Sequence, residues 1–461
     1  MLWAPRAWLP GGWQTQVLLN IGADGYWAEV TAGVASPPEG STVLKGPVLP
    51  GLVDAHSHSF QRAFAGLAER REGEADDFWS WRDRMYGVAL RITPDQLHAI
   101  AAQLYVELLR GGYTQVCEFH YLQHRENGSA YGDALAMSWA LADAAVDAGL
   151  GLTVLPVLYE RAGFAQPALR ADQRRFALGA YGVWDACQRI NAAHRSYVDA
   201  GLAVHSLRAA APDSIRRLRA LAEGFDGPIH IHVAEQVQEV DDCLQATGVR
   251  PVQWLANEGL LDARWQLVHA THVTPQETDA VARAAAGVVL CPSTEANLGD
   301  GLTDLPGWLA AGEGCVQLSI GSDSNVTRGW REELRLLEYG QRLSLRRRNV
   351  AAGSEHGTHV AATAERLWQR VVAGGGAAAG QRTWGLHKGA RADLLVVDTQ
   401  DASLLGVPAS HTLDALVFAS PGRPWRDVMV AGRFVVTDHR HAGSDPIAAR
   451  FRGVMGELWG E

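Results

Sequence analysis

Two histidines separated by one residue end an apolar run in the segment GLVDAHSHSF; they are His56 and His58. In a β-strand, residues two apart point to the same side, so both imidazoles can reach one metal ion. The same pair also arises by chance as two unrelated surface histidines. The pair alone therefore indicates only a candidate metal site at the end of a strand.

Three later apolar runs, PIHIHVAEQ, WQLVHATH and LSIGSDSN, end in residues of the same chemical kinds. They supply His232 with Glu235 three residues later, His269 together with His272, and finally Asp323. His230 lies two residues before His232, so its side chain points to the same side of the strand. It could be a packing residue or a hydrogen-bond partner of the metal ligands instead of a ligand. Four strand ends that supply HxH, HxxE, His and Asp in this order are hard to obtain by chance, so we interpret them as one functional centre.

The order HxH, HxxE, H, D resembles the amidohydrolase superfamily and, within it, the deaminase branch. The resemblance implies a distorted (β/α)8 barrel that holds one zinc ion, with another divalent metal such as iron as the alternative. Members with two metals carry a bridging carboxylated lysine at a strand end, and the matching segment GLAVHSLRAA contains no lysine. A mononuclear site is therefore favoured.

The chemistry of such a site assigns a role to each residue. The expected zinc ligands are His56, His58, His232 and Asp323. Zinc can lower the pKa of bound water to about 7, and Asp323 is placed to take the proton of that water. Glu235 would carry a proton to the leaving nitrogen, and His269 would stabilise the charge that develops during attack. The alternative for Glu235 is a solvated carboxylate at a helix start.

Four further segments resemble one subgroup of these deaminases, which acts on a formimino group. They are HSHSFQRAFAGLAERR from His56, DDFWSWRDRMY from Asp76, EFHYLQH from Glu118 and VHSLRAA from Val204. This likeness implies hydrolysis of N-formimino-L-glutamate to N-formyl-L-glutamate and ammonia, a step of histidine degradation. The nearest alternative is another mononuclear aminohydrolase, of the guanine or S-adenosylhomocysteine type. A barrel without catalysis is disfavoured because no ligand of the set is missing.

A substrate with two carboxylates needs cationic or strongly donating groups around it, and arginine suits this role best. The expected substrate-binding residues are Gln61, Arg82, Tyr121, His205 and Arg208. An isolated arginine is usually a solvated surface residue. Arg82, however, stands in the aromatic stretch FWSWRDRMY, and Arg208 follows a predicted strand. Arg84 competes with Arg82, and only the resemblance prefers Arg82.

The elements that position these residues follow from the hydrophobic pattern. Short apolar runs such as GYTQVCEFH, GLTVLPVLY and GVVLCPST alternate with longer amphipathic stretches such as ITPDQLHAIAAQLYVELLRGG. Strands that alternate with helices predict parallel βα units, and their number favours a closed (β/α)8 barrel. Active sites of such barrels lie at the C-terminal ends of the strands, where the residues above are expected.

The two ends of the chain have a different pattern. Roughly the first 45 residues alternate short apolar runs with glycine turns, and strand signals return from about Leu386, where the helical pattern stops. We predict a small, discontinuous β-sandwich domain from residues 1–48 and 386–461, with the barrel over 49–385. The stretch VVAGGGAAAGQ from Val371 is expected to be a helix end and a loop.

The composition of the chain disfavours some classes of binding partner. The 461 residues carry a formal charge of −10, which gives no overall attraction to nucleic acid or to an anionic membrane. The HxE and PCxxC signature of compact nucleic-acid deaminases is absent. The five cysteines are scattered without CxxC spacing, so we expect neither a disulfide framework nor a cysteine zinc site. Without a signal-peptide pattern or a long apolar run, we expect a cytoplasmic protein. As partners we expect a small dicarboxylate substrate and a second copy of the chain in a homodimer, with no nucleic acid and no membrane.

Overall fold

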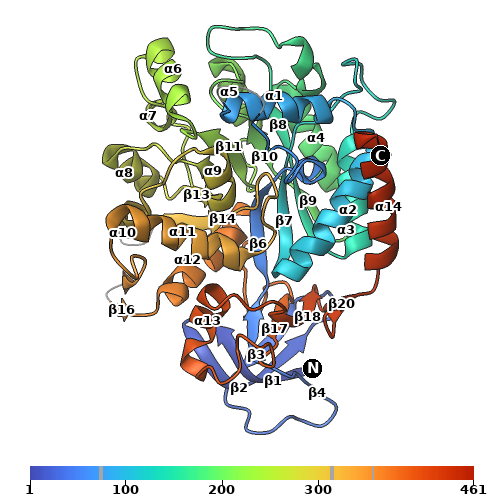
Figure 1. Cartoon of the computed structure of the whole chain (residues 1–461), viewed down its shortest axis with the longest axis vertical. Coiled ribbons are helices and arrows are strands. Elements are labelled where there is room, and N and C mark those ends of the chain that lie inside the picture. The colour runs from blue at the N-terminus through green and yellow to red at the C-terminus, as the bar shows by residue number, and fades with distance from the viewer. Residues whose placement is uncertain (72–75, 312–315, 356–357, 461) are drawn as a thin grey trace.

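The computed structural model describes residues 1–71, 76–311, 316–355 and 358–460. Within these ranges a parallel barrel occupies one end of the molecule and a separate sheet the other (Figure 1). The barrel strands are β6 (Leu52–Ser57), β7 (Tyr113–His120), β8 (Gly151–Leu158), β9 (Val198–Ala200), β10 (Leu202–Val204), β11 (Ile229–Val233), β12 (Trp265–His269), β13 (Gly287–Leu290) and β14 (Gln317–Ile320).

Consecutive barrel strands pair in parallel, with β9 and β10 together filling the fourth position. A parallel bridge between Ser57 and Asp323 joins the first strand position to the last and closes the ring. Every residue of β7, β8, β11, β12 and β13 is buried, as expected for strands that are covered on both faces. The predicted (β/α)8 barrel is confirmed.

Helices cover the barrel and connect its strands (Figure 1). They are α1 (Phe78–Ala89), α2 (Pro94–Gly111), α3 (Ala136–Ala148), α4 (Ala180–Ala192), α5 (Pro212–Leu221), α6 (Val237–Thr247), α7 (Pro251–Asn257), α8 (Pro275–Arg283), α9 (Pro292–Leu298), α10 (Leu305–Ala310), α11 (Trp330–Leu345) and α12 (Thr363–Ala378). Short 3-10 turns are η1 (Ser59–Ala63), η2 (Ala171–Phe176) and η4 (Ala409–His411).

The boundaries of α2 show how the sequence sets such helices. The Thr93 side chain accepts a hydrogen bond from the Gln96 backbone N–H, and Pro94 occupies the first helical position. The helix ends at Gly111 and is capped by Gly112, whose φ of 93° gives the left-handed conformation that glycine adopts without steric cost. Local capping signals therefore place this helix directly before β7.

The separate sheet contains strands from both ends of the chain, as predicted. Its strands are β1 (Leu2–Leu9), β2 (Gly12–Ile21), β3 (Trp27–Thr31), β4 (Thr42–Val43), β5 (Val48–Pro50), β17 (Leu394–Val397), β18 (Trp425–Val430), β19 (Arg433–Thr437) and β20 (Arg440–His441). The two ends meet where β5 pairs with β17, and a second hydrophobic core around Trp27 and Leu394 lies on this sheet. The strands β15 (Gly353–Glu355) and β16 (Thr358–Val360) pair with each other in a separate two-stranded antiparallel sheet.

The expectation that helices stop near Leu386 is wrong. Two helices follow, α13 (Thr412–Phe418) and α14 (Ser444–Trp459). The last helix runs beside α2 of the barrel (Figure 1), and its Trp459 indole donates to the Ala63 carbonyl oxygen of η1 at 3.0 Å. Apolar residues at helical spacing, from Ile447 through Phe451 to Val454, supply the face that packs there.

The glycine-rich stretch from Val371 is a helix end followed by a loop, as expected, because α12 continues through its glycines to Ala378 and residues 379–381 lie outside the helix. A Cβ atom on Gly374 would lie 2.0 Å from the Leu318 carbonyl oxygen of β14. A Cβ atom on Gly376 would lie 2.6 Å from the Trp384 Cβ atom. The glycines therefore let α12 approach the barrel more closely than any side chain would allow.

The described cysteines Cys117, Cys187, Cys243 and Cys291 are buried and unpaired, whereas Cys315 lies outside the described residues. Among the helices that the structure describes, none combines the length and the apolar character needed to cross a bilayer.

Candidate active site

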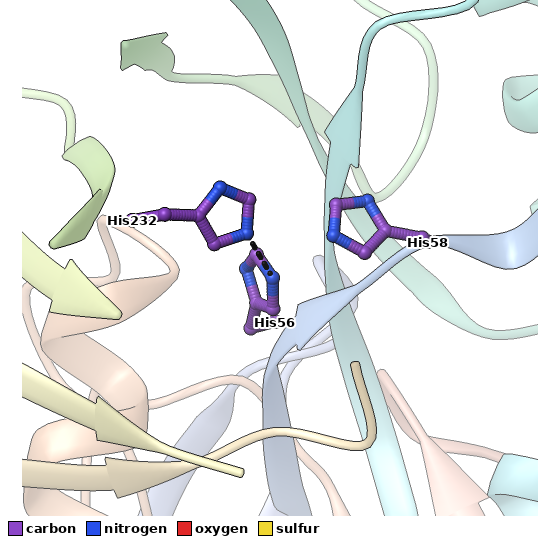
Figure 2. Close-up of side chains that lie close together, drawn as sticks. All are labelled: His56, His58 and His232. Atoms are coloured by element: carbon purple, nitrogen blue, oxygen red, sulfur yellow. Dashed lines mark hydrogen bonds between the residues drawn. The ribbon is translucent and has the colours of Figure 1, made fainter. Parts of the chain in front are cut away.

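Three imidazoles gather at the C-terminal mouth of the barrel, and Figure 2 shows their rings turned toward one another. His56 lies at the end of β6, His58 directly follows that strand, and His232 lies on β11. All three are buried, and one nitrogen of each lies within 4.8 Å of the others. The alternation of side chains along β6 thus brings both residues of the HxH pair to one point.

The outer nitrogens of two of these rings are held by backbone carbonyl groups. His58 Nδ1 lies 3.0 Å from the Phe119 carbonyl oxygen, and His232 Nδ1 lies 3.0 Å from the His205 carbonyl oxygen. Because a carbonyl oxygen can only accept, each Nδ1 donates, and the Nε2 lone pair faces the centre. Burial, reinforced by the neighbouring His56, lowers the pKa of His58 to about 3 and that of His232 well below its usual value. Both rings are therefore neutral.

These neutral nitrogens fit a metal ion. His56 Nε2 and His232 Nε2 lie 3.0 Å apart (Figure 2), while His56 Nδ1 has no hydrogen-bond partner among the described residues. Converging lone pairs in a buried place repel one another unless a cation lies between them. Three imidazole nitrogens of this kind are common ligands of zinc.

Asp323 supplies the fourth donor from the loop after β14. Its Oδ1 lies 3.5 Å from His56 Nε2 and 3.4 Å from His58 Nε2. Burial disfavours its ionised form, but the nearby imidazoles of His56, His269 and His58 outweigh burial and hold the pKa of Asp323 well below its usual range. Its backbone N–H donates to the His56 carbonyl oxygen at 2.8 Å, so barrel closure itself sets the position of this carboxylate.

His269 lies at the end of β12 and contacts three carboxylates. Its Nε2 is 3.6 Å from Glu235 Oε1 and 3.7 Å from Asp323 Oδ2, and its Nδ1 is 3.3 Å from Glu295 Oε1. Burial opposes the charged form of the ring, but these carboxylates raise the pKa of His269 to about 10. An imidazolium here can stabilise negative charge beside Asp323.

Glu235 follows β11 and sits between His269 and Arg208. Burial raises the pKa of its carboxyl to about 7, although the charges of His269 and Arg208 favour the ionised form. The Arg208 Nη2 atom lies 3.9 Å from Glu235 Oε2. A carboxyl with a pKa near neutrality can both accept and return a proton, which is what the predicted role requires.

Two carboxyl groups of the site were missed by reasoning from the sequence. Glu295 accepts from the Cys291 backbone N–H at 2.9 Å and contacts His269. Asp300 lies within 4.8 Å of Glu235 and His269, and burial raises its pKa to about 9. The signal was the segment GVVLCPSTEANLGDG, since these acids follow the C-terminal end of β13.

A second donor group, His269 with Cys291 and Asp323, shares one carboxylate with the imidazole cluster. Burial raises the pKa of the Cys291 thiol well above its usual value. A thiol binds zinc as the thiolate, so this group is a poorer metal site than the three neutral imidazoles with Asp323.

A cavity of about 670 Å³ opens beside these groups. Its lining includes all the residues expected to bind substrate, namely Gln61, Arg82, Tyr121, His205 and Arg208. The Gln61 amide nitrogen donates to the Tyr121 hydroxyl at 3.4 Å. Burial and the charge of Arg208 lower the pKa of His205 well below its usual value, so that ring is neutral. The structure thus brings the predicted substrate residues together next to the predicted metal ligands.

Three arginines line the cavity; Arg170 pairs with Asp83 and Asp172, whereas Arg82 and Arg208 retain unused hydrogen-bond donors. The side chains of Arg82 and Arg208 are only 17% and 9% exposed. Arg82 Nε and Arg208 Nη1 are buried and have no hydrogen-bond partner among the described residues. Arg84, by contrast, donates to the Ala68 carbonyl oxygen at 3.0 Å and pairs with Asp76. The geometry therefore favours Arg82 over Arg84 for contact with a ligand.

The other histidines considered from the sequence do not join the cluster. His230 lies on β11 with its Nε2 2.8 Å from the Ala378 carbonyl oxygen of α12, so it packs between strand and helix. His272 Nε2 lies 2.8 Å from the Asp300 carbonyl oxygen. His230 thus has the packing role that its position in the strand allowed.

Comparison with known proteins adds a family to this geometry. A model of the amidohydrolase family matches residues 48–435. The chain is 46% identical to the formimidoylglutamate deiminase of Pseudomonas aeruginosa, over 99% of each chain. It resembles the crystal structure of an amidohydrolase from Brucella melitensis with a TM-score of 0.92, at 42% identity and 99% coverage of each chain. The 5-methylthioadenosine/S-adenosylhomocysteine deaminase of Natronomonas pharaonis is more distant, at 28% identity over 85% of this chain and 81% of that protein.

Proposed function

The chain belongs to the amidohydrolase family, and from that premise we propose that it hydrolyses N-formimino-L-glutamate to N-formyl-L-glutamate and ammonia. The observation that carries this proposal is a cavity in which two buried guanidinium groups with unused donors lie beside a metal-binding cluster. Two carboxylates need two such groups, whereas a purine ring does not. The 46% identity to a formimidoylglutamate deiminase supports the same substrate.

The metal of this site would be held by three imidazoles and one carboxylate. His56, His58, His232 and Asp323 are the donors that fit it. When bound there, zinc supplies the acidity that makes water a nucleophile at neutral pH. We propose one zinc ion per chain, with iron as the alternative metal.

The chain's own residues would move the protons of the reaction. In this account Asp323 takes a proton from the attacking water, and Glu235 delivers a proton to the nitrogen that leaves as ammonia. His269, charged and 3.7 Å from Asp323 Oδ2, stabilises the negative charge of the tetrahedral intermediate. Attack by water turns the imine nitrogen into an amino group, and the remaining hydroxyl proton reaches that nitrogen as the C=O bond forms and the C–N bond breaks. Both protons of the water thus end on the nitrogen that leaves as ammonia, so the hydrolysis is balanced.

Substrate orientation would depend on the far side of the cavity. Arg82 and Arg208 each have in-plane donors that suit a carboxylate, and Gln61 and Tyr121 add neutral donors. His205, neutral and buried, can donate or accept a single hydrogen bond. Held from that side, the formimino carbon would be presented to the metal cluster.

We further propose that the protein is a cytoplasmic homodimer that acts in histidine degradation. We also propose that residues 1–48 and 386–461 form the small domain and residues 49–385 the barrel. In this division α14 belongs to the small domain by its residue numbers, although it contacts the barrel through Trp459 and Glu457.

Release of ammonia by the zinc-loaded protein tests the proposed function. N-formimino-L-glutamate should be hydrolysed with a kcat/KM far above that for guanine, adenosine or S-adenosylhomocysteine. The heterocyclic substrates serve as controls because they share the chemistry but lack the two carboxylates. Preferential deamination of any of them would show that the dicarboxylate proposal is wrong.

A further inference from the structure

One aromatic ring lies against Arg82 and Arg208, the two arginines of the cavity that have unused donors. The Arg82 Cζ atom is 4.6 Å from the centre of the Trp79 ring, and the Arg208 Cζ atom is 5.3 Å from it. Both distances are within the roughly 6 Å over which a cation is attracted to an aromatic face. Trp79 therefore contacts two guanidinium groups that come from different parts of the barrel.

Each of the two cations also lies near a second aromatic ring. Arg82 Cζ lies 5.6 Å from the Tyr86 ring centre, and Arg208 Cζ lies 5.7 Å from the Phe78 ring centre. Acidic neighbours are more distant than in a tight ion pair, since Arg82 is 3.8 Å from Asp83 and Arg208 is 3.9 Å from Glu235. Aromatic contacts occupy the faces of a guanidinium and leave its N–H edges free.

Two cations in one buried cavity repel each other when no anion is bound. A ring that attracts both reduces this penalty and keeps both guanidiniums in place before substrate arrives. The alternative for each arginine is to swing toward an acid, Asp83 for Arg82 or Glu235 for Arg208, which would use its donors. The shared ring opposes both movements.

The base of Trp79 is itself fixed. Trp79 is the second residue of α1, and its backbone N–H donates to the Asp77 side chain at 2.9 Å. Asp77 and Ser80 form a capping box at this helix start. Figure 1 shows α1 at the end of the barrel opposite the small sheet, which is the end that carries the site.

We propose that Trp79 is a positioning residue for both arginines and thereby sets the preference of the cavity for dicarboxylates. The inference rests on the proposed function, because it assigns the two carboxylates of the substrate to the two guanidiniums. Trp79 would act through Arg82 and Arg208 and not on the reacting atoms. Its loss should therefore change KM much more than kcat.

The test compares Trp79→Leu with Trp139→Leu. Trp139 on α3 makes the same kind of contact with Arg195, at 4.7 Å, but does not line the cavity. Trp79→Leu should raise KM for N-formimino-L-glutamate about tenfold or more and change kcat less than about threefold. Trp79→Phe, which keeps an aromatic face, should recover most of the loss, and Trp139→Leu should match the parent.

A double-mutant cycle makes the test specific. If Trp79 acts through Arg82, then Arg82→Met should cost several-fold less in kcat/KM in the Trp79→Leu background than in the parent. The same should hold for Arg208→Met. Additive effects for both arginines would overturn the inference, as would an unchanged KM or a fall in kcat alone.

Glutarate binding, measured by calorimetry, gives a readout that needs no turnover. The parent and Trp139→Leu should bind glutarate equally, and Trp79→Leu at least about tenfold more weakly. If the parent releases no ammonia yet glutarate binding still depends on Trp79, the proposed reaction fails and the inference stands. If glutarate binds equally to all variants, or to none, the inference fails whatever the activity.

Discussion

Glu235 is the residue that would carry the proton to the leaving nitrogen. Its carboxyl lies 3.6 Å from His269 Nε2, and burial raises its pKa to about 7. Glu235→Gln keeps the shape of the side chain but removes its transferable proton. We expect kcat to fall at least about 10²-fold while zinc content stays at the parent level. Steady-state kinetics with metal analysis checks this, and near-normal turnover would place the proton transfer elsewhere.

In the proposed reaction, Arg82 and Arg208 would determine substrate choice. Removing one bidentate contact by Arg82→Met or Arg208→Met should reduce kcat/KM about 30-fold or more, with zinc content unchanged. Lysine at either position should rescue only partly, because it keeps the charge but lacks the planar fork. Arg84→Met is the matched control, because Arg84 lies on α1 with Arg82 but uses its donors on Ala68 and Asp76. Parent rates for both cavity variants would rule out the dicarboxylate pocket.

At this scale the sequence indicated most of the site. His56, His58, His232, His269 and Asp323 were found because each lies at or just after the C-terminal end of an apolar run, which a closed barrel must bring together. The choice between Arg82 and Arg84 needed the structure, since residues two apart on a helix leave orientation open.

Glu295 and Asp300 were missed for a related reason. Both lie at and beyond α9, and their distance from His269 depends on how that helix returns to the barrel mouth. A carboxylate several residues past a strand end looks like a solvated helix residue in sequence. Only the packed structure shows that these acids are buried.

Among the elements, α12 shows how glycine can serve packing inside a helix. Gly374→Ala places a Cβ atom 2.0 Å from the Leu318 carbonyl oxygen, so helix and strand must separate. We expect this variant to lose about 1 to 3 kcal/mol of stability and to melt several degrees lower.

Gly453→Ala on α14 is the matched control, because nothing lies within 4 Å of the new Cβ atom. Better helix propensity should make that variant about 1 kcal/mol more stable. Thermal melting of the two proteins compares them directly. Equal stabilisation by both substitutions would contradict the packing role of Gly374.

The sequence shows tertiary packing only in part at two helices. The stretch from Val371 was expected to contain a helix end and a loop, but the pattern did not show that Gly374 to Gly376 stay helical because α12 packs closely on β14, against the low helix propensity of glycine. α14 was missed because strand signals dominate the segment before it. Tertiary packing decided both elements, and the sequence shows such packing only indirectly.

For the whole molecule, the proposed metal joins distant parts of the barrel. His56 and His58 belong to the first strand position, His232 to the fifth, and Asp323 follows the last. We expect one equivalent of zinc or a similar divalent ion, and no turnover for His56→Ala or Asp323→Ala. Chelation should lower the melting temperature, and added zinc should restore it, because a ligand that binds only the folded state stabilises it. Two tightly bound metal ions per chain would contradict the mononuclear assignment.

The identity of the products tests the central claim most directly. The tetrahedral intermediate formed from N-formimino-L-glutamate can expel either ammonia or the amino group of glutamate. Proton delivery by Glu235 to the terminal nitrogen, with the glutamate part held by Arg82 and Arg208, requires the first outcome. Proton NMR of a complete reaction by the zinc-loaded parent should therefore show N-formyl-L-glutamate, with ammonia released in equal amount. Formamide with free glutamate, or unchanged substrate, would contradict the account.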